Sequence, residues 1–212
     1  MHTSFCTICY AFATMRAMDT VVLASSSPRR QELLKQMGIP FIVCAEEIDE
    51  SWDGSGDILE FACRLAKKKI DSVLTKHLVR GSRWFIGADT LVLCGKRILG
   101  KPKNREEAES FLKFLAGKSH RVITGVALYD RHTDRYDYTS ETAWVRFAPL
   151  EEEEIQWYLN TGEWQGVAGG YRIQQRAACF VESLRGNYST VMGLPIRSIY
   201  VILKRNNYPF FG

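Results

Sequence analysis

A run of hydroxyl and guanidinium side chains follows the first short apolar stretch of the chain. Residues 23–30 are Leu-Ala-Ser-Ser-Ser-Pro-Arg-Arg. Ser27 suits a helix N-cap and Pro28 the first helical position, so a strand over 21–23 is predicted to turn into a helix there. The free N–H groups of a helix N-terminus, together with Arg29 and Arg30, favour a bound phosphate. From this stretch alone, a capped surface helix with two solvated arginines is an equally good interpretation.

A carboxylate interrupts the most apolar strand pattern in the sequence. Residues 84–93 are Trp-Phe-Ile-Gly-Ala-Asp-Thr-Leu-Val-Leu, a central-strand pattern that contains Asp89 and Thr90. Burying a carboxylate costs free energy unless the group is paired or bound to a metal. Asp89 is therefore the acid with the strongest claim to a chemical role.

The elements that must position these residues alternate along the chain. Helices are predicted to begin at Asp57 and Asn104, where an acidic residue three positions later completes a capping pattern. The other predicted elements are strands over 41–44, 97–99, 120–129, 136–147 and 179–182, and helices over 149–160 and 194–205. Such a mixture predicts an α/β domain with a mixed twisted sheet in two lobes and a central cleft. We expect one domain over 20–212, preceded by a loosely ordered extension over 1–19.

Composition excludes several classes of protein. The chain has 212 residues, 46% of them hydrophobic, and no apolar run approaches the roughly 18 residues of a membrane span. Its formal net charge of +4 suits a small anionic ligand, but the clustered basic stripe of a nucleic-acid-binding protein is missing. The glycine-rich stretch 162–170 matches neither a Walker A nor a GxGxxG pattern, which disfavours a P-loop NTPase or a Rossmann dehydrogenase.

The six cysteines form no dense framework, which favours a reducing compartment and predicts a cytoplasmic protein. Cys6 and Cys9 form half of a zinc or redox motif. Because no second CxxC follows, metal binding there is a minor hypothesis.

Six blocks of the chain, taken in order, form a recognisable set. They are Ser25-Ser26-Ser27-Pro28-Arg29-Arg30, Gly87-Ala88-Asp89-Thr90, Gly100-Lys101-Pro102, Thr124-Gly125-Val126-Ala127, Ala168-Gly169-Gly170-Tyr171-Arg172-Ile173-Gln174 and Val191-Met192-Gly193-Leu194-Pro195. In sequence and order they resemble the blocks of the Maf nucleotide pyrophosphatases, a family related in fold to the inosine triphosphate pyrophosphatases. The resemblance runs from about Val21 to the C-terminus. It implies an elongated two-lobed fold, a homodimer, a divalent metal, and hydrolysis of a nucleoside triphosphate to monophosphate and pyrophosphate.

The resemblance also implies roles for individual residues. Asp89 matches the catalytic carboxylate, which orients or deprotonates the attacking water and contacts the metal, and Glu50 matches a second carboxylate on the metal side. The residues that match the phosphate-contacting set are Ser27, Arg29, Arg30, Lys69 and Lys101. Mg²⁺ or Mn²⁺ suits such oxygen-rich surroundings. An ordinary ion-pair network is the alternative interpretation of the same residues.

Two positions predict the base. The blocks containing Thr90 and Gln174 resemble the branch of the family that hydrolyses dTTP and UTP, and this resemblance implies the same substrates here. The side chains suit them, since a short Thr90 leaves room beside the acid and the Gln174 amide offers both a donor and an acceptor to a pyrimidine. Arg172 and Gln175 depart from the family pattern, which usually has a small residue and Gly, and they put base selectivity in doubt. The alternatives are hydrolysis of 7-methyl-GTP or of inosine or xanthosine triphosphate, and a non-catalytic nucleotide-binding regulator of cell division.

Overall fold

The computed structural model describes residues 18–52, 56–76, 79 and 81–211. Most of the predicted N-terminal extension, including Cys6 and Cys9, lies outside the described residues. Within those residues, no helix combines the length and the apolar content that a membrane span requires.

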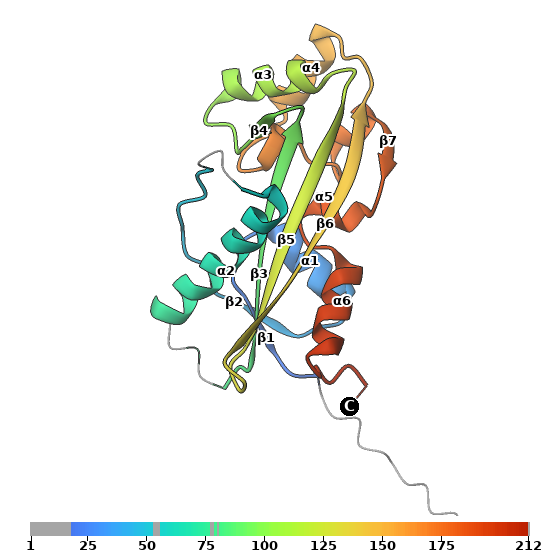
Figure 1. Ribbon diagram of the computed structural model, residues 1–212. Coiled ribbons are helices and arrows are strands. Elements are labelled where there is room, and N and C mark those ends of the chain that lie inside the picture. Colours follow the sequence, from blue (N-terminus) through green and yellow to red (C-terminus); the bar gives the residue numbers. More distant parts are fainter. Residues whose placement is uncertain (1–17, 53–55, 77–78, 80, 212) are drawn as a thin grey trace, which may run out of the picture.

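One mixed sheet runs the length of the molecule in the order β2-β1-β3-β5-β6-β7, and β4 pairs with the end of β3 (Figure 1). β1 is parallel to both of its neighbours, whereas all other pairs are antiparallel. The strands are β1 (Val21–Leu23), β2 (Phe41–Val43), β3 (Trp84–Cys94), β4 (Arg97–Leu99), β5 (Ser119–Asp130), β6 (Arg135–Phe147) and β7 (Val181–Arg185). The prediction of a mixed α/β fold is confirmed.

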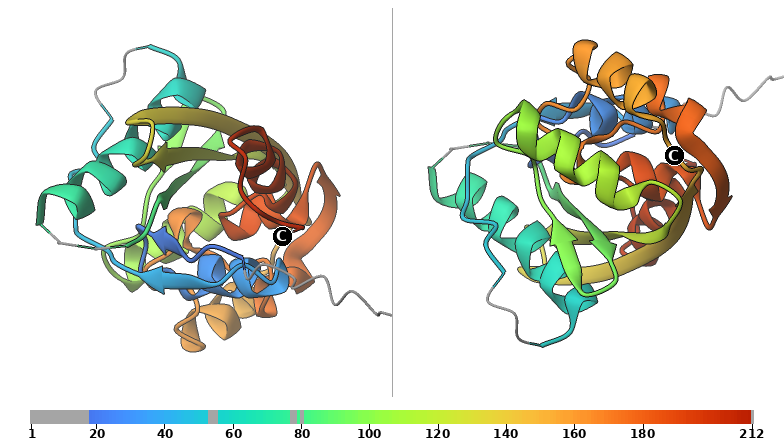
Figure 2. Two further views of the ribbon diagram at one scale, coloured as in Figure 1. Left: turned by 90° about the horizontal axis from the view of Figure 1, so that it is seen from below. Right: turned by 90° about the horizontal axis from the view of Figure 1, so that it is seen from above.

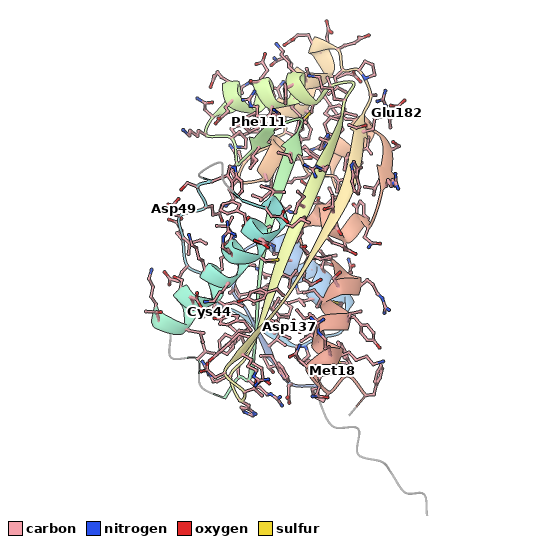
Figure 3. All side chains as sticks on the ribbon, viewed as in Figure 1. Met18, Cys44, Asp49, Phe111, Asp137 and Glu182 are labelled. Atoms are coloured by element: carbon pink, nitrogen blue, oxygen red, sulfur yellow. The ribbon has the colours of Figure 1, made fainter. Side chains whose placement is uncertain are left out.

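Helices cover both faces of the sheet. They are α1 (Pro28–Gln36), α2 (Ile58–Lys76), α3 (Arg105–Leu115), α4 (Glu152–Asn160), α5 (Tyr188–Met192) and α6 (Ile196–Arg205), with short 3₁₀ turns η1 (Ala168–Gly170) and η2 (Arg176–Phe180). α2 packs on one face of β3 and β5, while α1, α5 and α6 lie on the other (Figures 1 and 2). α3 and α4 cap the far end of the sheet, so that Phe111 on α3 and Asp137 on β6 lie toward opposite ends of the molecule (Figure 3).

Two glycines let the backbone of α2 touch the sheet. A Cβ atom on Gly87 would lie 2.1 Å from the carbonyl oxygen of Ala66, and one on Gly125 would lie 2.3 Å from the carbonyl carbon of Ala62. Gly125 is paired with Asp89 in the antiparallel β3–β5 ladder, and Gly87 lies two residues before Asp89 on β3. The close approach therefore brings the buried side of α2 against the strand that carries Asp89.

The structure of the C-terminal third differs from the sequence-based expectation at three places. α5 was not predicted, because five residues that include the β-branched Thr190 and Val191 show no helical period. The predicted strand over 179–182 is instead a 3₁₀ turn followed by β7 at Val181–Arg185. The last helix begins at Ile196 rather than at 194, because Gly193 adopts a left-handed conformation (φ 105°) that ends α5.

Candidate active site

The sheet carries one lobe with β1, β2, α1 and α2 and, toward its other end, a second lobe with β4, α3 and α4 (Figure 1). A cleft of about 1130 Å³ lies between the two lobes. Residues 24–30 and the segment between β2 and α2, which Asp49 marks in Figure 3, line it from one lobe. Residues 96–103 and the glycine-rich segment contribute from the other lobe. The cleft brings together eight of the nine predicted site residues, namely Ser27, Arg29, Arg30, Glu50, Lys69, Asp89, Thr90 and Lys101.

The acidic half of the cleft is neutralised by lysines. Lys69 Nζ forms an ion pair with Asp89 Oδ1 and lies 2.8 Å from Glu50 Oε1. Lys101 Nζ lies 2.8 Å from Glu50 Oε2. Asp89 is buried because strand alternation turns it toward α2, and Lys69 is buried because it lies on the α2 face that packs on β3. Of the run Lys67–Lys69, Lys69 alone is buried, which makes it the functional candidate.

The lysines keep Glu50 ionised. Burial on its own would raise the pKa of Glu50, but the ammonium groups of Lys69 and Lys101 outweigh burial and lower the pKa to about 2. Glu50 is therefore a carboxylate throughout the neutral pH range. An ionised oxygen donor of this kind can serve a metal ion as well as an ammonium group.

The arginines of α1 donate to neutral acceptors. Arg30 is 9% exposed and donates from Nε to the Gly193 carbonyl oxygen at 2.8 Å, and from its terminal nitrogens to Ser25 Oγ at 2.9 Å and Thr90 Oγ1 at 3.3 Å. Arg29 Nε donates to the Met192 carbonyl oxygen at 3.3 Å. Because none of these acceptors is charged, the hydrogen bonds hold the guanidinium groups in place and leave their charge for an anion.

Burial and mutual repulsion tune these arginines. Burial lowers the pKa of Arg29 to about 10, with further lowering by the charges of Arg30 and Arg172. Burial likewise lowers the pKa of Arg30, while the carboxylates of Asp89 and Glu50 oppose the shift. Each shift reflects a cost of holding positive charge in the cleft, which a bound anion would offset.

Ser27 does not cap α1 with its side chain, contrary to the expectation for a helix N-cap. Its Oγ atom is buried without a hydrogen-bond partner among the described residues, although Ser27 lines the cleft. A buried hydroxyl usually finds a partner. An oxygen of a bound phosphate would supply one.

The glycine-rich segment differs most from expectation. Gln174 is not among the residues that line the cleft, and its buried Oε1 atom has no partner among the described residues, so its role toward the base stays a prediction. Arg172 and Gln165 line the cleft instead. Arg172 donates from Nε to the Glu163 carbonyl oxygen at 2.7 Å and from a terminal nitrogen to the Gln165 carbonyl oxygen at 2.8 Å. These bonds tie Arg172 to its own segment.

Sequence reasoning missed the functional partners Ser25, Met192 and Gly193. Two of them act through backbone carbonyl groups, which residue type does not reveal. The only signal was that all three lie inside blocks by which the chain resembles the Maf pyrophosphatases.

The family model described as Maf-like protein matches residues 20–206. The chain belongs to the Maf family. Curated relatives named dTTP/UTP pyrophosphatase share its sequence over most of their length. The protein of Symbiobacterium thermophilum is 45% identical over 92% of this chain and 97% of its own, and that of Desulforamulus reducens is 43% identical over 86% and 94%. That of Geobacter sulfurreducens is 44% identical over 87% and 95%.

The donor set of this Maf protein fits a divalent metal that is shared with substrate. Within the described part of the chain, no three His, Cys, Asp or Glu side chains are grouped so that they could hold a metal ion on their own. Asp89 and Glu50, however, lie on either side of one ammonium group and offer oxygen donors. Mg²⁺ commonly takes one or two carboxylates and completes its shell with water and substrate phosphates.

Proposed function

We propose that this Maf protein is a nucleoside triphosphate diphosphatase that hydrolyses dTTP and UTP to the monophosphate and pyrophosphate. The observation that carries the proposal is one cleft that contains a buried carboxylate, Asp89, and guanidinium groups, Arg29 and Arg30, whose hydrogen-bond acceptors are all neutral. The activity printed for the curated relatives supports the same reaction.

Asp89 orients the attacking water. Its carboxylate accepts a hydrogen bond from the water and takes up the proton as the water oxygen bonds to the α-phosphorus. The bond between this phosphorus and the bridging oxygen breaks, and pyrophosphate leaves. Lys69 forms an ion pair with Asp89 in the free protein. When substrate binds, its ammonium group also contacts phosphate oxygens.

Arg29, Arg30 and the Ser27 hydroxyl hold the β and γ phosphates. Negative charge grows on the leaving pyrophosphate, and fixed cations stabilise it without reorganising at the moment of reaction. Lys101, which is exposed at the cleft, adds a positive charge from the opposite lobe. Asp89 and Glu50 would hold the Mg²⁺ or Mn²⁺ ion, which, when bound, neutralises phosphate oxygens.

The base is recognised beside Thr90 and the glycine-rich segment. A pyrimidine preference rests on the block that contains Thr90 and on the relatives' names. Gln174 would take part only if the segment rearranges, since it does not line the cleft of the free protein. Arg172, whose guanidinium group donates to two carbonyl oxygens of the same segment, makes the segment stiffer.

Release of pyrophosphate from a panel of triphosphates, with Mg²⁺ and then Mn²⁺, tests the proposal. We expect the highest kcat/KM for UTP or dTTP, then for CTP, with 7-methyl-GTP far behind. A lead for 7-methyl-GTP or ITP would overturn the base assignment and leave the pyrophosphatase activity standing. Nucleotide binding without turnover of any triphosphate would instead indicate a regulator.

We further propose that the protein works in the cytoplasm as a homodimer. The described cysteines Cys44, Cys63, Cys94 and Cys179 are free thiols, as suits a reducing compartment. Light scattering on the purified chain tests the dimer, because a mass near the 24.2 kDa of one chain would contradict it.

A further inference from the structure

A row of polar side chains crosses the sheet behind Arg30. Thr90 on β3 is paired with Thr124 on β5, and Thr124 is paired with Glu141 on β6. Residues that face each other across antiparallel strands project on the same side of the sheet. The row therefore lies on the side that carries α1 and α5, opposite to Asp89 and α2.

The hydrogen bonds in this row run in one direction. Thr124 Oγ1 donates its single hydrogen to the Thr190 carbonyl oxygen at 2.8 Å, because a carbonyl group can only accept. Thr124 Oγ1 must then accept from Thr90 Oγ1, which is 3.0 Å away. Thr90 in turn accepts from Arg30 at 3.3 Å. The order is thus Arg30 to Thr90 to Thr124 to the backbone of α5.

Glu141 fixes α5 from the other end of the row. Its Oε2 atom accepts from Thr190 Oγ1 at 2.6 Å and its Oε1 atom accepts from Asn187 Nδ2 at 2.7 Å. Five residues are too few to form a stable helix alone, so α5 depends on such contacts. The end of this helix supplies the carbonyl groups of Met192 and Gly193 to Arg29 and Arg30.

Gly193 packs closely against both Thr90 and Arg30. A Cβ atom at this position would lie 3.1 Å from Thr90 Oγ1 and 3.5 Å from Arg30 Nε. The end of α5, the first hydroxyl of the row and the guanidinium group of Arg30 are therefore packed against one another. A shift of α5 must shift Arg30.

We propose that Thr124, Thr190 and Glu141 are positioning residues, which set Arg29 and Arg30 for the β and γ phosphates before substrate arrives. The inference rests on the proposed function, because it assigns the arginines to the phosphate chain. It also changes the role of Thr90. The hydrogen of the Thr90 hydroxyl is committed to Thr124, so Thr90 acts through Arg30 and has no hydrogen left to donate to a base.

Calorimetric binding of pyrophosphate and of UMP to the whole chain, each with excess Mg²⁺, tests the proposal. Thr124→Val keeps the shape of this fully buried side chain and removes its hydroxyl, whereas Thr124→Ser keeps the hydroxyl. We expect Thr124→Val to raise the Kd of pyrophosphate about 5- to 30-fold, the size of one or two lost hydrogen bonds, and that of UMP less than about 2-fold. Thr124→Ser should stay within about 2-fold of wild type for both.

Glu141→Gln gives a second test if Thr124→Val does not fold, because Glu141 is only half-buried. We expect it to weaken pyrophosphate binding in the same selective way. Thr142→Val is the matched control, since its side chain is on the same strand but points to the α2 face, and it should change neither Kd. Equal losses for pyrophosphate and UMP, or no rescue by Thr124→Ser, would show that the row is merely structural and overturn the inference.

The two proposals fail separately. If wild type binds pyrophosphate but hydrolyses no triphosphate, the proposed function is wrong, while the variants still decide the inference by binding alone. If wild type hydrolyses UTP and both Thr124→Val and Glu141→Gln bind pyrophosphate like wild type, the inference is wrong and the function stands.

Discussion

Charged side chains in the cleft are held in two different ways. Asp89 and Glu50 are paired with Lys69 and Lys101, so their charge is already compensated. Arg29 and Arg30 donate to carbonyl and hydroxyl oxygens, so neither guanidinium group has a carboxylate as a hydrogen-bond partner in the described part of the chain. The arginine side of the cleft therefore favours a bound anion in the free protein. Asp89, which lies beside it, is already paired with a lysine.

Asp89→Asn should separate binding from chemistry. Asn keeps the size and polarity of the side chain but cannot take the proton from water, so we expect hydrolysis of UTP to fall by about two to four powers of ten. Lys69 keeps Glu50 as a partner, which should leave folding and UTP binding nearly intact. Single-turnover kinetics and nucleotide titration measure the two effects. An active variant would remove Asp89 from the mechanism.

Arg29→Ala and Arg30→Ala should differ in their effect on stability. Each should weaken triphosphate binding by about 1.5–3 kcal/mol for the lost charge-assisted contact, and weaken UMP binding less. Arg30→Ala should also lower the Tm, because Arg30 is buried and donates to three acceptors, whereas the one hydrogen bond of Arg29 is long at 3.3 Å. Thermal unfolding beside UTP and UMP titrations checks both parts. Equal losses for UTP and UMP would show that these arginines do not face the β and γ phosphates.

Elements that carry their own local signals were predictable from sequence. α3 begins where expected, and Asn104 Oδ1 accepts from the Glu107 backbone N–H at 2.9 Å, as the capping pattern requires. α2 follows its apolar period. α5 could not be predicted, because the contacts that form it come from Glu141 and Thr124, far away in sequence. Ser27 shows the opposite case, a residue at its predicted N-cap position whose hydroxyl is not used for the cap.

Gly125→Ala should displace α2. The added Cβ would meet the backbone of Ala62 at 2.3 Å, which cannot move as a flexible side chain would, so we expect a loss of about 1–3 kcal/mol or more in the free energy of unfolding. Because α2 carries Lys69, activity should fall as well. Gly100→Ala is the matched control for stability, since its Cβ would meet nothing within 4 Å. Chemical denaturation of both variants tests this prediction. Equal free energies of unfolding would contradict it, because they would show that α2 can move to accommodate the added Cβ atom at no cost.

At the scale of the whole molecule, acid should loosen the lobe that lies farthest from β1. His120 at the start of β5 is buried, packs against Phe147 and Tyr171, and forms a 2.9 Å hydrogen bond with the Tyr171 hydroxyl. Burial lowers the pKa of His120 from 6.5 to about 4. The unfolded chain therefore binds a proton between these values that the folded protein excludes.

His120 should accordingly make the protein less stable as the pH falls. Where the unfolded state binds more protons than the folded state, the free energy of unfolding decreases as the pH falls. For His120 this loss begins below pH 6.5 and is complete near pH 4. Its size is about 2 kcal/mol between pH 7 and pH 5. Urea unfolding of wild type and His120→Phe across this range isolates the effect from the carboxylates. Parallel stability curves for the two proteins would contradict it.

The set of residues that meet in the cleft was predictable only in part. The order of the sequence blocks indicated a two-lobed fold and, through the resemblance they carry, eight residues that do line the cleft. It did not indicate that Lys69 bridges two acids, nor that the arginines rest on carbonyl groups, because both depend on how α2 and α5 pack. Gln174 shows the limit, since its side-chain chemistry suits a base but its position lies outside the cleft.

Arg30 and the carbonyl group that holds it are 163 residues apart in the chain. A ribosome that adds about 5–20 residues per second needs roughly 8 to 30 s to make that stretch. During this time a nascent chain exposes two arginines with no α5 to hold them. The phosphate pocket can therefore form only late in synthesis, and a chain interrupted before residue 187 would retain Asp89 and Lys69 but bind pyrophosphate poorly.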